Sequence, residues 1–275
     1  MLLAAGFAYV AYLYLSLPDV RQLRVENPDP TAFMRLRERE AHALGKPAVK
    51  DQRWVPYGRI SQNLKRAVIV TEDSAYWQHD GVDYDQLRES METNWERGEF
   101  ARGASTITQQ LAKNLYLDPV KNPLRKLKEL LITRRLEVEL SKQRILEIYL
   151  NVIEWGDGVW GAEAAARRYF HKPASELTPS ESALLAAAIA NPHLMDPAHP
   201  SARLRRRQQM IMRRMGAVTP PPVVTEPLAP FVPDIPILDI PDVGAPTALP
   251  GSPVPPPPTP APTPGRGGRG GGPGL

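Results

Sequence analysis

Proline is distributed so unevenly along this chain that its last part cannot belong to a packed fold. The sequence has 275 residues and 31 prolines, and 19 of these prolines lie after Gly216. The segment reads PPPVVTEPLAPFVPDIPILDIPDV and then PPPPTPAPTPGRGGRGGGPGL. Such a composition buries too little apolar surface to offset the entropy of the chain. We therefore predict a disordered Pro/Gly-rich tail over residues 217–275 and expect the fold to precede it.

The start of the chain is a second compositional segment. Residues 2–17 (LLAAGFAYVAYLYLSL) carry no charge, and Pro18 and Asp19 end the run. It is slightly shorter than the ~20 residues that span a bilayer, and it lacks the basic start and the cleavage site of a signal peptide. We predict a transmembrane anchor over residues 1–18. Arg21 and Arg24 follow it and by the positive-inside tendency favour a cytoplasmic domain, so charge leaves the orientation open.

The overall charge narrows the classes of partner. The formal net charge is +4 and the sequence pI is about 9.3, which favours lipid head groups, diphosphates or nucleic acid. The sequence has no cysteine, which excludes disulfides, zinc–thiolate sites and thiol catalysis. Nucleic-acid binding is suggested by the pI alone, and a membrane anchor argues against it.

Between these ends the sequence predicts a polar linker over residues 19–60 and a mainly α domain over residues 61–216. The linker contains an Arg/Glu-rich patch (RLREREAH) expected to form a short solvated helix. Apolar residues recur at helical spacing through a basic stretch and predict one long or once-broken amphipathic helix; they are Leu124, Leu127, Leu131, Val138, Ile145 and Tyr149. Thr178, Pro179 and Glu181 predict a capped helix start before ALLAAAIA, which should be buried.

Four segments carry groups suited to chemistry. In AVIVTEDSAYWQHDG (67–81) an apolar run leads to Glu72 and Asp73, and burial there would raise the pKa of a carboxylate and make it a useful base. The alternative is a helix end with ordinary surface acids. In RGASTITQQLAKN (102–114) hydroxyls, amides and a lysine suit sugars and phosphate. The alternative there is a polar helix start capped by Ser105 or Thr106.

The other two segments are basic and architectural. In KNPLRKLKE (121–129) Arg125 and Glu129 share a helix face, so the glutamate pairs with the arginine or faces a metal-bound diphosphate. A solvated face is the plainer alternative. KQRILEIYLN (142–151) and the following WGDGVWGAEAAARRYFHKP mix apolar and small residues, and their glycines permit tight chain approaches.

In order and spacing these segments resemble the motifs of peptidoglycan glycosyltransferases, the lysozyme-like transglycosylase family. That family carries E-D-x-x-[FY]-x-x-H-x-G, G-[GA]-S-T-I-T-Q-Q-L-x-K-N, R-K-x-x-E, K-x-x-I-L-E-x-Y-L-N and G-x-x-x-A-A-x-x-Y-F. The matching segments here are Glu72–Gly81, Gly103–Asn114, Arg125–Glu129, Lys142–Asn151 and Gly161–Phe170. The resemblance implies a lysozyme-like helical domain with a small membrane-facing jaw, expected around residues 87–100 where Trp95 and Phe100 reach the lipid interface or simply pack.

The resemblance also implies an activity: polymerisation of lipid II into glycan strands, with release of undecaprenyl diphosphate. Glu72 would be the general base for the acceptor hydroxyl and Asp73 its orienting neighbour. Glu129 would hold the basic groups or a Mg or Mn ion that is bound with the diphosphate. The groups expected to neutralise the diphosphate are Lys113, Lys121, Arg125 and Lys126. Those expected to bind sugar and phosphate edges are Ser105, Thr106, Gln109, Gln110 and Asn114.

Some residues depart from the family pattern, and none of them is an expected catalytic group. Ser74 replaces a basic or polar residue, Ala104 a glycine, and His171 a glycine before the lysine. The chain has no S-x-x-K and no K-T-G, so the transpeptidase of bifunctional relatives is not expected. The resemblance is therefore to the monofunctional branch, single-pass in the inner membrane with its domain on the outer side, where it meets lipid II, the growing glycan and other cell-wall proteins.

Two other classes of function remain as alternatives. A lytic transglycosylase or lysozyme-type enzyme also uses a glutamate, but it protonates a glycosidic oxygen and needs no diphosphate clamp. The basic cluster over residues 113–126 therefore favours synthesis. An inactive cell-wall scaffold would use the proline-rich tail, and the retention of Glu72 and Glu129 argues against it. His193, Asp196 and His199 lack helical spacing and are not expected to bind metal.

Deletion of residues 220–275 tests the predicted tail. Because the segment lacks the pattern of a packed element, the shortened chain should keep its helical circular dichroism spectrum and its turnover of lipid II. A shortened chain that unfolds would contradict the prediction.

Overall fold

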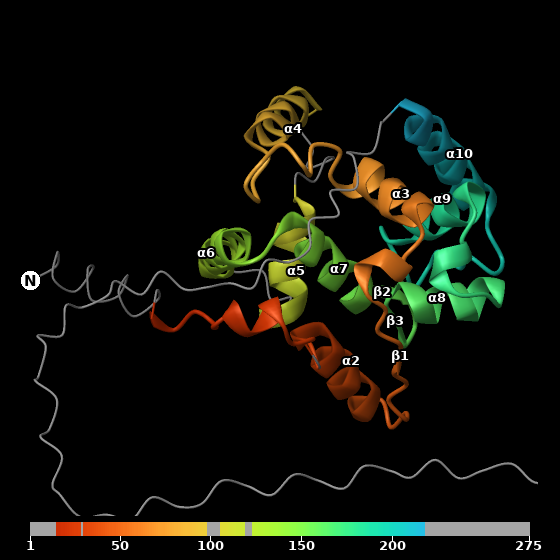
Figure 1. The fold of residues 1–275 in the computed structure, drawn as a ribbon, viewed down its shortest axis with the longest axis horizontal. Helices are drawn as coiled ribbons and strands as arrows, with labels where there is room; N and C mark the ends of the chain where they lie inside the picture. Colours follow the sequence, from red (N-terminus) through yellow and green to blue (C-terminus); the bar gives the residue numbers. More distant parts are fainter. Residues whose placement is uncertain (1–14, 29, 98–104, 119–122, 218–275) are drawn as a thin grey trace, which may run out of the picture. The chain divides into compact units, whose positions relative to one another are not determined.

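The computed structural model describes residues 15–28, 30–97, 105–118 and 123–217, without the side chains of 94–97, 123 and 217 (Figure 1). Apart from Ala217 at the end of the last helix, the predicted tail over residues 217–275 lies outside the described residues. The described part is mainly α. Its α-helices are α2 Ala32–Ala43, α3 Gln62–Glu72, α4 Tyr84–Arg97, α5 Ile107–Tyr116, α6 Pro123–Glu139, α7 Lys142–Val152, α8 Ala162–Phe170, α9 Pro179–Ala188 and α10 Ala202–Ala217. Its 3-10 helices are η1 Arg21–Arg24, η2 Tyr57–Arg59 and η3 Ala174–Glu176.

Helices α3, α9 and α10 pack against one another and position the end of α3 (Figure 1). The α9 start is the capping box that the sequence predicted: Thr178 accepts from the backbone N–H of Glu181, whose side chain in turn accepts from the N–H of Thr178. Pro179 occupies the first turn, and every residue from Ser182 to Ala188 is buried. The prediction of a buried, proline-started helix is therefore confirmed.

Helix α5 packs against α2, α6 and α7. The predicted amphipathic helix is broken once: α6 ends at Glu139, and Ser141 caps α7 by accepting a hydrogen bond from the Arg144 N–H at 3.2 Å. A serine side chain that bonds the backbone favours a helix start over a helix interior. The break therefore falls at the serine, and the two helices can pack on different neighbours.

A small three-stranded sheet joins α7 to α8. Its order is β1 (Asp51–Gln52), β3 (Val159–Trp160) and β2 (Glu154–Gly156), with β1 parallel and β2 antiparallel to β3. Gly161 follows with φ +83°, and a Cβ there would lie 2.6 Å from the Asn151 carbonyl oxygen. The predicted tight approach of the chain at these glycines is confirmed, because only glycine fits this position.

His171, the departure from the family glycine, ends α8 in the left-handed conformation with φ 57°. Glycine adopts this conformation without steric cost, which explains its presence in relatives. In this chain His171 adopts the conformation despite its side chain, which makes the backbone there strained.

The segment over residues 19–60 was predicted to be a linker with a solvated helix. The helix is present as α2, but Val20, Leu23 and Met34 are buried in the hydrophobic core. Arg24 also bonds the side chain of Glu139 at 2.6 Å. Much of this segment therefore packs on the domain, because apolar residues are interspersed among its charges.

The predicted membrane anchor lies mostly outside the described residues. At its end Leu15 is 81% exposed, whereas Leu17 is buried in the core. Among the described residues no helix is both long and apolar enough to cross a bilayer.

Lys65 provides a pH test of the packing around α3. It is 3% exposed, and its ammonium group donates to the Tyr57 carbonyl at 3.2 Å. Burial lowers the pKa of Lys65 to about 8, whereas the unfolded value is roughly 10.4. Above about pH 8 the folded state therefore binds fewer protons than the unfolded state, so stability should rise with pH.

We predict that, between about pH 8 and about pH 10, the wild type gains unfolding free energy relative to Lys65→Met. Urea unfolding across this range measures the difference. Above it, Tyr57 acts in the opposite direction, because burial raises the pKa of its hydroxyl. Parallel curves for the two proteins would contradict the prediction.

Candidate active site

Glu72 is the last residue of α3, and a neutral donor holds its carboxylate. The Gln110 amide on α5 donates to Glu72 Oε2 at 3.0 Å. The Tyr149 hydroxyl on α7 donates to Gln110 Oε1 at 2.8 Å. Burial raises the pKa of Glu72, against the opposing effects of Gln110, Arg207 and Lys113. The expectation that desolvation would raise this pKa is confirmed, and the group is suited to accept a proton.

Asp73 faces the interior of the protein rather than a substrate. It is 1% exposed, and its Oδ1 lies 2.8 Å from His79 Nε2. Its Oδ2 accepts from the backbone N–H of Ile107 at 2.9 Å, at the start of α5. A carboxylate is favoured there by the helix dipole and by the unpaired N–H groups of the first turn. Asp73 thus positions α5 against the end of α3.

Most polar residues at the start of α5 also serve the fold. Thr106 and Gln109 form a capping box, and the Thr106 hydroxyl donates to the Gly81 carbonyl at 2.7 Å. The Asn114 amide donates to the Gln110 carbonyl at 2.8 Å. Ser105 is exposed. The predicted cap is confirmed at Thr106, and the polarity of this segment reflects internal hydrogen bonds as much as any binding role.

Glu129 lies among cations on α6. It is 3% exposed, and its two carboxylate oxygens contact Arg125, at 3.0 Å, and Lys126. The predicted pairing of Glu129 with Arg125 is therefore present, and the alternative of a solvated face is wrong for this buried glutamate. Lys121, expected to join this cluster, lies outside the described residues.

The surroundings of Glu129 do not fit a metal ion held by the protein. Both carboxylate oxygens already contact cations, and the charge of Lys113 acts on the same group. A divalent ion would displace these contacts and meet three positive side chains. We therefore derive no chemical step through a metal at Glu129.

Lys113 connects the two acidic centres. Burial lowers the pKa of its ammonium group, and the charge of Glu129 is the main opposing effect, with Glu72 also contributing. Lys113 is half-buried on α5, one turn after Gln110. One cation therefore lies within electrostatic range of both Glu72 and the cluster around Glu129.

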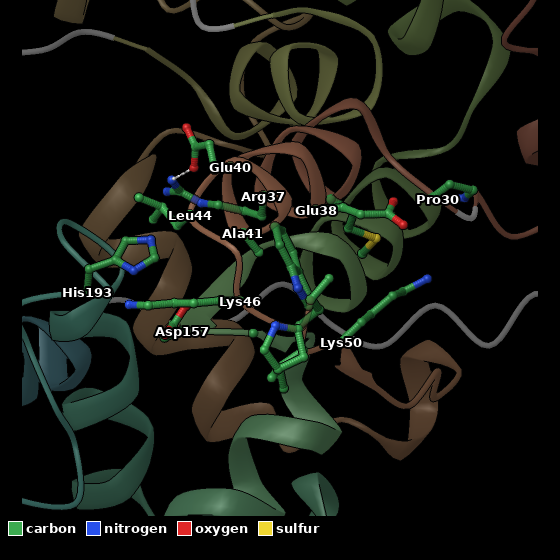
Figure 2. Close-up of a pocket in the computed structure, with 16 residues that line it drawn as sticks. Pro30, Arg37, Glu38, Glu40, Ala41, Leu44, Lys46, Lys50, Asp157 and His193 are labelled. Carbon is green, nitrogen blue, oxygen red and sulfur yellow. Dashed lines mark hydrogen bonds and ion pairs between the residues drawn. The ribbon is translucent and has the colours of Figure 1, made fainter.

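A cavity of about 560 Å³ lies elsewhere, between α2 and the turn that joins β2 and β3 (Figure 2). Its charged lining is balanced, with three cations and three acids in addition to His193: Arg37, Lys46, Lys50, Glu38, Glu40 and Asp157. Arg37 is paired with Glu40 at 2.7 Å and with Glu154 at 3.0 Å. The predicted site residues do not line this cavity, and it offers no excess of positive charge to a diphosphate.

Two residues near Glu72 were not selected from the sequence. Tyr149 was counted only as an apolar position, although a tyrosine on a buried helix face signals a hydroxyl that needs a partner. Arg207 lies three residues after Leu204 and four before Ile211, both buried on α10, so the spacing places it toward the core. Its Nε is buried without a hydrogen-bond acceptor among the described residues.

Comparison with known proteins identifies the family of this chain. The family model described as "Transglycosylase" matches residues 38–216, so the chain belongs to this family. A biosynthetic peptidoglycan transglycosylase of Nitrosomonas eutropha is 47% identical over 215 residues, 78% of this chain and 87% of the relative. A relative with the same description from Chromobacterium violaceum is 44% identical over 80% of this chain and 97% of its own length. Another, from Ralstonia nicotianae, is 49% identical over 72% of this chain and 87% of its own length.

Asp73→Asn tests the positioning role of the buried carboxylate. The amide cannot keep both acceptor oxygens, so one buried partner loses its bond and unfolding free energy should fall by about 2 kcal/mol. Asp80→Asn, at an exposed position in the same segment, should change it by less than about 0.5 kcal/mol. Urea unfolding gives both values. Equal unfolding free energies for Asp73→Asn and Asp80→Asn would contradict the positioning role of Asp73.

Proposed function

We propose that this chain polymerises lipid II into peptidoglycan glycan strands, with Glu72 as the general base. Family membership and the descriptions of the relatives support the reaction class. The observation that carries the mechanism is that Lys113 lies within electrostatic range of both the half-buried Glu72 and the cationic cluster around Glu129. Transfer from a lipid diphosphate needs both a base and positive charge near the leaving group.

The base acts on the acceptor. A sugar hydroxyl is a weak nucleophile, and Glu72 accepts its proton as the new glycosidic bond forms. The raised pKa of Glu72 brings the carboxylate nearer to the working pH, where proton acceptance is most effective. Gln110 orients this carboxylate.

The cations act on the donor. The departing undecaprenyl diphosphate carries concentrated negative charge, which Lys113, Arg125 and Lys126 neutralise. Arg125 keeps a buried Nε–H without an acceptor among the described residues, a donor available to a phosphate oxygen. Glu129 holds Arg125 and Lys126 in place through its two contacts. Lys121 belongs to the same proposal because it lies in the same basic segment, residues 121–129.

The substrate is a membrane lipid, and two helices present apolar side chains to it. On α4 these are Tyr84, Leu87 and Met91, which are 75%, 40% and 64% exposed. Leu124 and Leu127 on α6 are each 43% exposed. We assign these surfaces to the lipid interface, with residues 1–18 as the anchor. Leu87 and Met91 belong to the jaw expected around residues 87–100; the side chain of Trp95 and the whole of Phe100 lie outside the described residues. The site would then face the outer side of the inner membrane.

Glycan cleavage is the competing reaction. A raised pKa at Glu72 would also suit an acid that protonates a glycosidic oxygen. The glycan substrate of a cleaving enzyme carries no diphosphate, so cleavage would not require the positive charges of Arg125, Lys126 and Lys113. The cationic cluster therefore favours synthesis.

Glu72→Gln tests the base. The amide keeps the shape but accepts no proton, so lipid II consumption should fall by at least ~10²-fold while lipid II binding is retained. Labelled lipid II measures turnover, and circular dichroism confirms folding. The control is Glu176→Gln at an exposed position, which should turn over like the wild type. Near wild-type turnover by folded Glu72→Gln would exclude this residue as the base.

A further inference from the structure

We propose that Tyr149 is a positioning residue for the base: its hydroxyl fixes the Gln110 amide so that an N–H donor always faces Glu72. The inference rests on the proposed role of Glu72. It assigns a function to the buried hydroxyl of Tyr149, a residue that the sequence pattern marks only as an apolar helix position.

The geometry is a chain of two hydrogen bonds across three helices. Tyr149 is 0% exposed on α7, and its hydroxyl donates to Gln110 Oε1 at 2.8 Å. The amide nitrogen of Gln110 donates to Glu72 Oε2 at 3.0 Å and to the Ser105 carbonyl at 3.3 Å. The donors and acceptors are thus ordered: the Tyr149 hydroxyl donates to the amide oxygen, and the amide nitrogen donates to the carboxylate.

The opposite orientation of the amide is disfavoured by the same groups. It would place Gln110 Oε1 against the carboxylate of Glu72, where two acceptors repel unless the acid is protonated. It would also take the acceptor from the Tyr149 proton. The hydroxyl is a dependable donor, because burial raises the pKa of Tyr149 well above its ordinary value. Tyr149 therefore favours the ionised form of Glu72, which is the form a base needs.

Other charged and polar groups act on Glu72 from the elements packed around it. They come from the end of α3 and from α5, α7 and α10. These groups are Asp73, Gln110, Lys113, Tyr149 and Arg207. Asp73 opposes ionisation of Glu72, whereas Lys113 and Arg207 favour it. These charges stay in place when only the Tyr149 hydroxyl is removed, so that substitution isolates the positioning effect.

The variant is Tyr149→Phe, and Tyr76→Phe is its matched control. Tyr76 is also 0% exposed, and its hydroxyl donates to the Lys142 carbonyl at 2.6 Å. Each variant removes one buried hydroxyl and leaves one acceptor without its donor. Thermal unfolding should therefore show similar losses of stability for the two proteins.

The readouts are the acidic limb of the pH profile of kcat/KM and a direct titration of Glu72. Carbon-13 NMR of glutamate-labelled protein follows the carboxyl carbons, and Glu72→Gln identifies the resonance. Tyr149→Phe should move the limb and the titration midpoint to higher pH, by on the order of one unit. Tyr76→Phe should move neither. In a Gln110→Met background Tyr149→Phe should produce no further shift.

An unchanged titration of Glu72 in folded Tyr149→Phe would overturn the proposal. So would an equal shift in the Gln110→Met background, because the effect would then bypass the amide. If Tyr149→Phe does not fold, 3-fluorotyrosine at position 149 keeps the hydroxyl as a stronger donor, and the midpoint should move to lower pH; no movement overturns the proposal. The NMR titration needs no turnover, so a wild type that fails to polymerise lipid II would refute the proposed function separately.

Discussion

The buried carboxylate of Asp73 is the interaction on which the arrangement of the site depends. A buried charge is costly unless its oxygens are paired, and here the two oxygens are satisfied by His79 and by the first N–H of α5. These contacts bring the end of α3, the turn after it and the start of α5 together. The neighbouring residue, Glu72, is consequently held beside Gln110, and the polar start of α5 is fixed by its own capping box.

Two glutamates in this site have opposite surroundings, and their proposed functions follow from that difference. Glu72 receives a neutral amide donor, while cations act on it only at longer range and burial raises the pKa of its carboxyl. Glu129 contacts Arg125 and Lys126 directly. A carboxylate without a close cation remains able to accept a proton, whereas one with two such partners organises positive charge. Lys113 lies within electrostatic range of both glutamates, so the proposed base and the proposed diphosphate clamp share one cation.

The sequence predicted the fold where local signals agree with packing. The cap at Thr178 and the buried helix after it could be predicted from capping residues and composition. The helical spacing from Leu124 to Tyr149 left open whether that helix is broken, and the structure breaks it before Lys142. The packing of Val20, Leu23 and Met34 could not be predicted, because scattered apolar residues in a charged segment give no clear period. Helix α2 was expected, but its contribution to the core depends on contacts distant in the sequence.

The same limit applies to the site. Motif spacing identified Glu72, Glu129, Arg125 and Lys126, but it could not separate groups that face a substrate from groups that face the protein. Asp73 was expected beside the base and proves to be buried against α5. Which polar groups face inward depends on how α3, α5 and α7 cross, and that information lies in tertiary packing.

The central claim is that this site builds glycan rather than cutting it. The most direct measurement incubates the purified full chain with labelled lipid II and, in parallel, with finished uncross-linked glycan, and then determines product lengths. The account predicts that lipid II is converted into lengthening strands while the finished glycan keeps its length. Shortening of the finished glycan with no polymer formed from lipid II would contradict the account.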